Sequence, residues 1–362
     1  VIKALSKTEH ESEKFGGIAS DLASSEFRAQ RVMSLTNPLT SLILNLGLVA
    51  VIVAGAFLSA EAGDITGFLT YFIIVLNAML GISRIFVILS RGAASAERIE
   101  KVLALDEREK SEEHPAGDPA FAVEFKDVSF SYGGDKEHLT GISFALNKGA
   151  SLGIIGPTGC GKSTVVNLLL RLYDVSAGAV YVDGQDVRSL PSEKLRKKFG
   201  VVFQNGYLMA ASIRENIDYG RDLPEEAIIR AARCAQAEEF IKELPEGYGH
   251  DLAQKAGDLS GGQKQRLLIA RALAAFPEIV VLDDSSSALD YATDAALRRA
   301  LQREYAGTTR IVVAQRVSSV KNCDLILVLE NGSVTGAGTH EDLMKSCPEY
   351  RAIAETQMGE AV

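Results

Sequence analysis

The chain has 362 residues, of which 47% are hydrophobic and 23% are charged, and its formal net charge is −9. This length allows two or three domains, each large enough to bury a core. The acidic balance gives no electrostatic support for a nucleic-acid partner. The four cysteines show no metal-ligand or redox spacing, so we expect free thiols in a reducing compartment.

The first part of the chain contains two long uncharged stretches. No charged residue lies between Arg31 and Glu61, and Pro38–Ala60 exceeds the roughly 20 apolar residues that cross a bilayer. A second uncharged stretch follows at Ile65–Ser83. We therefore predict a membrane α-helical hairpin in residues 1–105, with spans at about 34–60 and 65–86. The alternative is a pair of buried soluble helices, although helices of this length normally show a polar face.

The orientation of this hairpin follows from its basic residues. The link between the two spans carries only the acids Glu61 and Asp64, whereas basic residues flank the hairpin on both sides: Lys3, Lys7, Lys14, Arg28 and Arg31 before it, and Arg84, Arg91, Arg98 and Lys101 after it. Both ends should therefore face the cytoplasm and the link the outside. The second helix should continue past Ser90 to about residue 105.

A charged, Pro- and Gly-containing stretch at 106–120 predicts a linker, and the pattern of apolar and polar residues changes after it. Alternating or apolar runs predict strands at 121–132, 149–156 and 278–284. Amphipathic patterns predict helices over 193–200, 224–244 and 292–305. Residues 121–362 therefore form an α/β domain.

The segment from Gly156 to Thr164, GPTGCGKST, has the spacing of a phosphate-binding P-loop. An apolar strand precedes it and an apolar helix follows, so backbone N–H groups and the positive helix end converge on one anion. Lys162 would supply a charge to the outer phosphates and Ser163 a hydroxyl to Mg²⁺. The candidate nucleotide contacts are Gly156, Thr158, Gly159, Cys160, Gly161, Lys162, Ser163 and Thr164. Asp283, at the end of a later strand, is the expected Mg²⁺ partner.

The segment LSGGQKQR, Leu259–Arg266, resembles the signature sequence of ABC ATPases, and with the P-loop it identifies residues 121–362 as similar to their nucleotide-binding domain with its helical subdomain. The resemblance places Tyr132 on the adenine of ATP, unless it is an ordinary strand-end aromatic. It also implies that Gln204 senses the metal and that Asp290 lies at a dimer interface. It further implies that Ser260, Gly261, Gly262 and Gln263 close over ATP bound by a second ABC half-transporter.

The stretches that flank the hairpin resemble those around the last two of six membrane helices in ABC exporters. This similarity covers nearly the whole chain. It implies that four earlier helices are missing here, either because the chain was cut or because they form a separate piece, and the sequence does not decide between these. It also implies that the chain lies in the plasma membrane of a bacterium, in contact with lipids.

Two positions depart from the family pattern at its catalytic centre. Active members have Glu after the metal-binding Asp, and this chain has Asp284, which is one methylene shorter. The switch histidine of the family is replaced by Gln315, which donates hydrogen bonds but carries no positive charge. A milder departure places Gln254 where exporters often have Glu. Because the signature is intact, the pattern resembles the degenerate-site subunit of heterodimeric bacterial multidrug transporters.

The sequence thus predicts an ATP- and Mg²⁺-binding subunit of a heterodimeric ABC exporter, with its own site impaired and the catalytic carboxylate on another chain. One rival is a homodimer in which Asp284 is a slow base. Another is a soluble ABC ATPase acting on DNA or ribosomes, against which the uncharged spans argue. Asn45 and Asn77 within the spans line a path for hydrophobic or amphipathic molecules or bond neighbouring helices, and the substrate stays open among drug, lipid and peptide.

Overall fold

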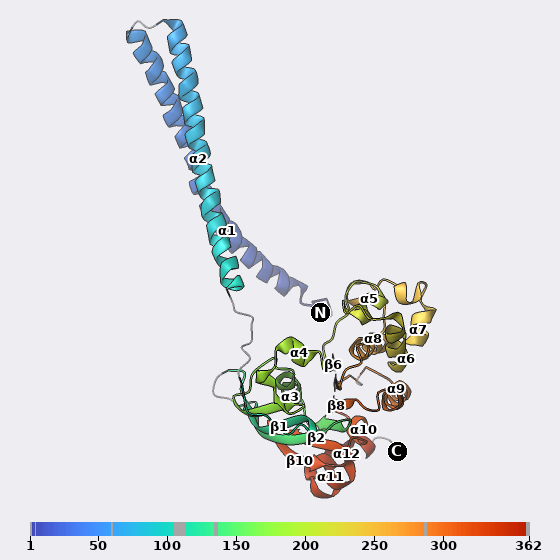
Figure 1. Ribbon diagram of the computed structural model, residues 1–362. Helices are drawn as coiled ribbons and strands as arrows, with labels where there is room; N and C mark the ends of the chain where they lie inside the picture. Colours follow the sequence, from blue (N-terminus) through green and yellow to red (C-terminus); the bar gives the residue numbers. More distant parts are fainter. Residues whose placement is uncertain are drawn as a thin grey trace. The chain divides into compact units, whose positions relative to one another are not determined.

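The structure is a computed structural model that describes residues 2–3, 5–58, 61–104, 113–133, 137–285 and 288–359. It divides into two units, residues 1–107 and 108–362 (Figure 1). Residues 106–112 of the linker predicted at 106–120 lie outside the described residues.

The first unit consists of two long helices, α1 (Thr8–Phe57) and α2 (Ala62–Leu103). Small residues on α1 let α2 approach closely. A Cβ added at Gly55 would lie 2.8 Å from Ile65, and one added at Gly47 would lie 3.2 Å from the Phe72 ring. The helices therefore pack through glycine-lined contacts, as helix pairs with small residues at the interface do.

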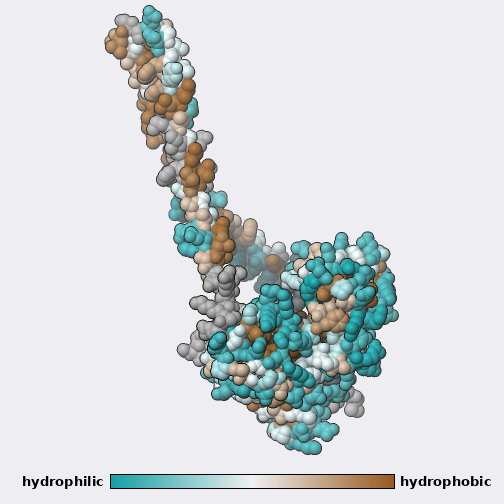
Figure 2. Space-filling view, in the orientation of Figure 1, coloured by the Kyte–Doolittle hydropathy of each residue, from teal (hydrophilic) through white to brown (hydrophobic). Residues whose placement is uncertain are grey.

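Large apolar side chains remain exposed along both helices, for example Leu46, Ile52 and Ile74 (Figure 2). Within the part of the chain that the structure describes, no helix has an apolar stretch long enough to cross a membrane. The two spans predicted at 34–60 and 65–86 are therefore not confirmed. The predicted continuation of the second helix is confirmed, since α2 runs to Leu103.

The second unit is an α/β fold with two sheets. An antiparallel sheet has the order β2-β1-β4-β5, from the strands β1 (Phe121–Phe130), β2 (Leu139–Asn147), β4 (Ala177–Val182) and β5 (Gln185–Asp186). The other sheet has the order β10-β9-β3-β8-β7-β6, from β3 (Ser151–Ile155), β6 (Phe199–Val202), β7 (Ile279–Asp283), β8 (Thr309–Ala314), β9 (Leu325–Glu330) and β10 (Ser333–Gly338). All neighbouring pairs from β9 to β6 are parallel, and β10 is antiparallel to β9.

Helices pack around these sheets in three groups (Figure 1). The apolar face of α3 (Lys162–Leu169) joins the core between the two sheets. A second core is mainly helical and unites α5 (Ile213–Asp218), α6 (Glu225–Cys234), α7 (Glu238–Glu243), α8 (Gly261–Leu273) and α9 (Tyr291–Glu304). A third core packs α10 (Val317–Val320), α11 (His340–Ser346) and α12 (Pro348–Gly359) against β9. A short helix, α4 (Ser192–Arg196), precedes β6.

Two helix predictions are corrected by the structure. The helix predicted over 193–200 ends at Arg196, because Phe199 and Gly200 already pair with β7 in the parallel sheet. The helix predicted over 224–244 is two helices. Gln236 adopts a left-handed φ of +58°, and the Ala237 N–H bonds back to the Ala232 carbonyl, which closes a Schellman motif that ends α6.

Candidate functional site

One edge of the parallel sheet collects the candidate nucleotide residues. The strands β3, β8, β7 and β6 are neighbours and parallel, so their carboxyl ends meet at the same edge. The P-loop follows β3, Gln315 follows β8, the acid pair ends β7, and Gln204 follows β6. The topology therefore brings together residues that lie up to about 160 positions apart in the chain.

The glycines of the P-loop are required by close backbone approach. A Cβ added at Gly156 would lie 2.1 Å from the Leu329 carbonyl oxygen. Gly161, the residue before α3, has a left-handed φ of +104°, and a Cβ there would lie 2.6 Å from the Leu139 side chain. The loop can turn tightly into α3 only with glycine at these positions, which leaves the positive end of α3 facing the cavity.

Lys162 places its charge inside this loop. The side chain is buried, and its Nζ donates hydrogen bonds of 2.8 Å to the carbonyl oxygens of Gly156 and Pro157. Both acceptors are neutral and do not balance the positive charge of the ammonium group. An anionic phosphate would therefore be a stronger partner for Lys162.

Asp283 is a buried carboxylate, 4% exposed, at the end of β7. Burial raises its pKa, and the charge of Asp284 raises it further, while a hydrogen bond to Ser163 and the charge of Lys162 act in the opposite direction. A carboxylate that is desolvated and placed beside a hydroxyl is a suitable ligand for a hard cation such as Mg²⁺.

The site fits Mg²⁺ only as a partner of phosphate. In the described ranges, no group of three or more His, Cys, Asp or Glu side chains forms a metal cage. Mg²⁺ usually takes one or two protein oxygens and completes its shell with waters and substrate phosphates. Ser163 and Asp283 would supply those protein oxygens, and bound Mg²⁺ would neutralise charge on the phosphates of the nucleotide.

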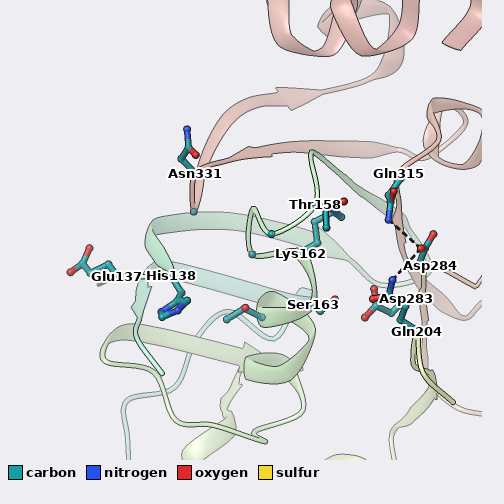
Figure 3. Close-up of a pocket in the computed structure, with 14 residues that line it drawn as sticks. Glu137, His138, Thr158, Lys162, Ser163, Gln204, Asp283, Asp284, Gln315 and Asn331 are labelled. Carbon is teal, nitrogen blue, oxygen red and sulfur yellow. Dashed lines mark hydrogen bonds between the residues drawn. The ribbon is translucent and has the colours of Figure 1, made fainter. Parts of the chain in front are cut away.

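Asp284 lies between two glutamine amides (Figure 3). Its Oδ2 is 3.4 Å from Nε2 of Gln204 and 3.3 Å from Nε2 of Gln315, and both amides donate to it. Its backbone has a left-handed φ of +49°, with its N–H bonded to the Val313 carbonyl at 2.9 Å. Such a backbone is uncommon for a residue with a Cβ and is often found at functional sites. Burial raises the pKa of Asp284, and the charges of Lys162 and Arg316 offset part of this.

These residues surround a cavity of about 310 Å³. Of the predicted site residues, it is lined by Thr158, Gly159, Gly161, Lys162, Ser163, Thr164, Gln204, Asp283, Asp284 and Gln315. Its other lining residues are Glu137, His138, Asn331 and Gly332 (Figure 3). The sequence patterns did not single out these four. They come from two loops that meet in space, since a Cβ at Gly332 would lie 2.5 Å from the His138 carbonyl, and no local pattern signals such a contact.

Three predicted nucleotide residues do not line the cavity. Cys160 is buried beneath it, with its Sγ 3.8 Å from Nζ of Lys162, and Gly156 lies at the back of the loop. Tyr132 is 45% exposed, and its hydroxyl accepts a hydrogen bond from Asn167 Nδ2 and donates one to Thr164 Oγ1, both at 3.2 Å. Its ring packs edge-on against His138, which does line the cavity.

The signature residues lie elsewhere, at the start of α8. Ser260 Oγ accepts from the Gln263 N–H, and the Gln263 side chain accepts from the Ser260 N–H, which forms a reciprocal capping box. Gly261 has open space around its Cα, and Ser260 through Gln263 do not line the cavity of their own chain. Asp290 caps α9 by accepting from Thr293, and Gln254 is exposed in a short turn.

Comparisons with known proteins agree with this geometry. Residues 139–287 match a family model described as ABC transporter. The chain is 35% identical to the uncharacterized ABC transporter ATP-binding protein YfiB of Bacillus subtilis (strain 168), over 99% of this chain and 63% of the relative. It is also 35% identical to a fatty acid ABC transporter ATP-binding/permease protein of Mycobacterium tuberculosis (strain CDC 1551 / Oshkosh), over 95% of this chain and 55% of that protein.

Among solved structures, a bacterial Atm1-family ABC exporter with ATP bound matches with a TM-score of 0.85 and 28% identity, over 97% of this chain and 63% of that chain. The chain therefore spans less than two thirds of the length of these relatives.

Proposed function

We propose that the chain is part of one half of an ABC exporter, because residues 139–287 match a family model described as ABC transporter and the chain is similar to ABC transporter ATP-binding proteins. It holds Mg²⁺–ATP at its own P-loop with little hydrolysis. Its signature segment, Ser260 to Gln263, completes the ATP site of a different partner half, so that the working transporter is a heterodimer. ATP binding then draws the two domains together and biases the membrane part toward one of its two states.

The observation that carries this proposal is the position of Asp284. A carboxylate that activates water must reach the attacking water, and Asp is one methylene shorter than Glu. A misplacement of about 1 Å can lower a rate on the order of a hundredfold. The same carboxylate oxygen lies near the amides of Gln204 and Gln315, and both of these groups are uncharged. The two amides occupy this oxygen and so compete with an attacking water for it.

The membrane part of the proposal rests on the sequence and on the first unit. The uncharged stretches around residues 34–60 and 65–86, together with the exposed apolar side chains of α1 and α2, support contact with lipid and with further helices. An exporter with ATP bound also shares the fold over nearly the whole chain. We place the hairpin in a bacterial plasma membrane with both ends in the cytoplasm, and we propose that the cargo is hydrophobic or amphipathic.

The proposed loss of the base can be tested by restoring it. In the full-length transporter, with the partner's P-loop lysine replaced to silence the partner, Asp284→Glu combined with Gln315→His should raise single-turnover hydrolysis at this site by about tenfold or more. Asp284→Asn, which keeps the shape and removes the charge, is the matched control and should give no gain. If the double variant hydrolyses ATP no faster than the unaltered chain, the base is not what this site lacks.

A further inference from the structure

The side chain of Gln357, on α12, bonds to the loop that carries Gln315. Gln357 donates from Nε2 to the Gln315 carbonyl oxygen, and its Oε1 accepts from the Val317 N–H, each at 2.8 Å. Both ends of the amide are therefore used, and both partners are backbone groups on either side of Arg316. Such a pair of bonds fixes the backbone of this loop whatever side chains it carries.

The bond to Val317 also supplies something that α10 lacks. The helix begins at Val317, and its N-cap, Arg316, makes no side-chain cap hydrogen bond. The first N–H groups of a helix have no partner within the helix. Gln357 accepts from one of them across a tertiary contact, and it thereby joins the start of α10 to α12.

α12 is anchored by its buried face, although Gln357 itself is exposed near the end of the helix. Tyr350 and Ala354 are fully buried in the core that α12 shares with α10 and β9, and the Tyr350 hydroxyl lies 2.8 Å from Nδ1 of His340 on α11. Gln357 is seven residues after Tyr350 and so lies on the same helix face. A side chain presented from a packed helix holds its partner more tightly than one presented from a loop.

Gln315 connects this support to the nucleotide cavity. It lines the cavity that holds Asp283 and Asp284, and it also lines a second cavity on the α12 side, together with Gln357. Its side chain donates to Asp284. A change in the Gln315 backbone therefore moves a polar group at the end of the cavity where Lys162 and Asp283 would meet the outer phosphates.

We propose that Gln357 is a positioning residue that holds Gln315 at the outer-phosphate end of the cavity and thereby lets this site distinguish ATP from ADP. The proposal rests on the proposed function in one respect, namely that Mg²⁺–nucleotide occupies this chain's own P-loop. It assigns to α12 a role in nucleotide selection in addition to packing.

The test compares Mg²⁺–ATP and Mg²⁺–ADP dissociation constants in the full-length transporter, with the partner's P-loop lysine replaced so that this site alone is read by displacement of a fluorescent ATP analogue. Gln357→Ala removes the two hydrogen bonds that hold the backbone around Gln315. It should weaken ATP binding by about tenfold, because Gln315 is then no longer fixed at the outer-phosphate end, and it should leave ADP binding unchanged. Gln357→Glu keeps the acceptor for Val317 and loses the donor, so it should give an intermediate loss and carries the test if the alanine variant folds poorly. Thr356→Ala, whose hydroxyl bonds Ala352 within α12, is the matched control and should change neither constant.

A second arm asks whether Gln357 acts through Gln315. In a Gln315→Ala background, Gln357→Ala should cause no further loss of ATP affinity. Unchanged affinities for both nucleotides in Gln357→Ala would overturn the proposal, and so would an equal loss for both, which would indicate a merely structural role. Failure of the unaltered site to bind Mg²⁺–ATP would instead contradict the proposed function.

Discussion

At the scale of single residues, the candidate site combines a buried lysine, a buried carboxylate and a second carboxylate with a restrained backbone. Lys162 is buried in a glycine loop, and Asp283 is desolvated beside Ser163, which suits a metal bound to phosphate. Asp284 is held in a left-handed backbone conformation between two uncharged amides. Lys162 and Asp283 thus provide the charges that a Mg²⁺–phosphate group needs, and we propose that Asp284 is too short and too restrained to activate water.

Asp283 gives a prediction about stability. Its pKa is raised above the ordinary value of 3.8, chiefly by burial. The folded state therefore holds this proton more tightly than the unfolded state does, and stability from this group is lost as the pH rises from that value through the raised pKa. Asp283→Asn should raise the melting temperature of the nucleotide-free protein at neutral pH by about 2 °C, while weakening Mg²⁺-dependent stabilisation by ATP.

A control variant, at Asp324, should change the melting temperature in the opposite direction. Asp324 accepts hydrogen bonds from the N–H and hydroxyl of Ser151, which lower its pKa. Asp324→Asn should therefore lower the melting temperature at neutral pH. Differential scanning calorimetry of both variants checks the pair. A lower melting temperature for Asp283→Asn would show that the buried charge is already compensated.

Tyr132 gives a prediction about nucleotide recognition. Its hydroxyl is bonded to Thr164 and Asn167 on α3, and its ring does not line the cavity. If the ring nevertheless stacks on adenine, Tyr132→Ala should weaken ATP binding by about 1–3 kcal/mol, by analogy with base–aromatic stacking, and Tyr132→Trp should be tolerated. Isothermal titration with ATP measures both. Equal affinities of the Ala and Trp variants would assign the residue to packing around His138 instead.

At the scale of elements, the sequence predicted best where a pattern is local. The strand before the P-loop and the strand ending at Asp283 were predicted from apolar runs, and β3 and β7 confirm them. The helix predicted over 292–305 corresponds to α9. The break at Gln236 was missed, since the amphipathic pattern continues across it and only the left-handed backbone interrupts the helix.

The cavity wall formed by His138 and Asn331 was not predictable in the same way. Its residues come from separate loops, which meet where the Thr140 N–H bonds to the Gly332 carbonyl and which carry no motif of their own. The Gln357 contact is similar, because it joins residues about 40 positions apart through backbone groups that every residue possesses. Sequence motifs thus predict the residues at the phosphate end of the site. The residues that hold them in place, such as Gln357, can be identified only from the tertiary structure.

The start of α8 yields a prediction with a built-in control. Ser260 caps α8 and Ser212 caps α5 with the same reciprocal box, so replacing either by Ala should lower stability by about 1 kcal/mol. Only Ser260→Ala should also reduce ATP turnover of the assembled transporter, because that hydroxyl is proposed to meet the partner's nucleotide. Urea unfolding and steady-state hydrolysis of both variants separate the two effects. Equal turnover in the two variants would leave Ser260 with a capping role alone.

At the scale of the whole molecule, the chain consists of a two-helix unit and an α/β unit in which residues 139–287 match a family model described as ABC transporter. The chain spans 63% of the length of the solved exporter chain to which it is similar. The candidate nucleotide cavity and the segment from Ser260 to Gln263 lie on different parts of this α/β unit. This separation supports an arrangement in which each chain completes the site of another, and unequal sites then become possible.

The most direct measurement of that division of labour is steady-state ATP hydrolysis by the full-length transporter with its partner, in nanodiscs. Asp284→Ala should lower turnover by no more than about twofold, because the proposed division of labour assigns most hydrolysis to the partner's site. Ser260→Arg should lower it by at least about tenfold, since a bulky cation at the start of α8 would block closure over the competent site. If Asp284→Ala abolishes turnover while Ser260→Arg leaves it intact, then Asp284 is a working base and this chain's own site is the catalytic one.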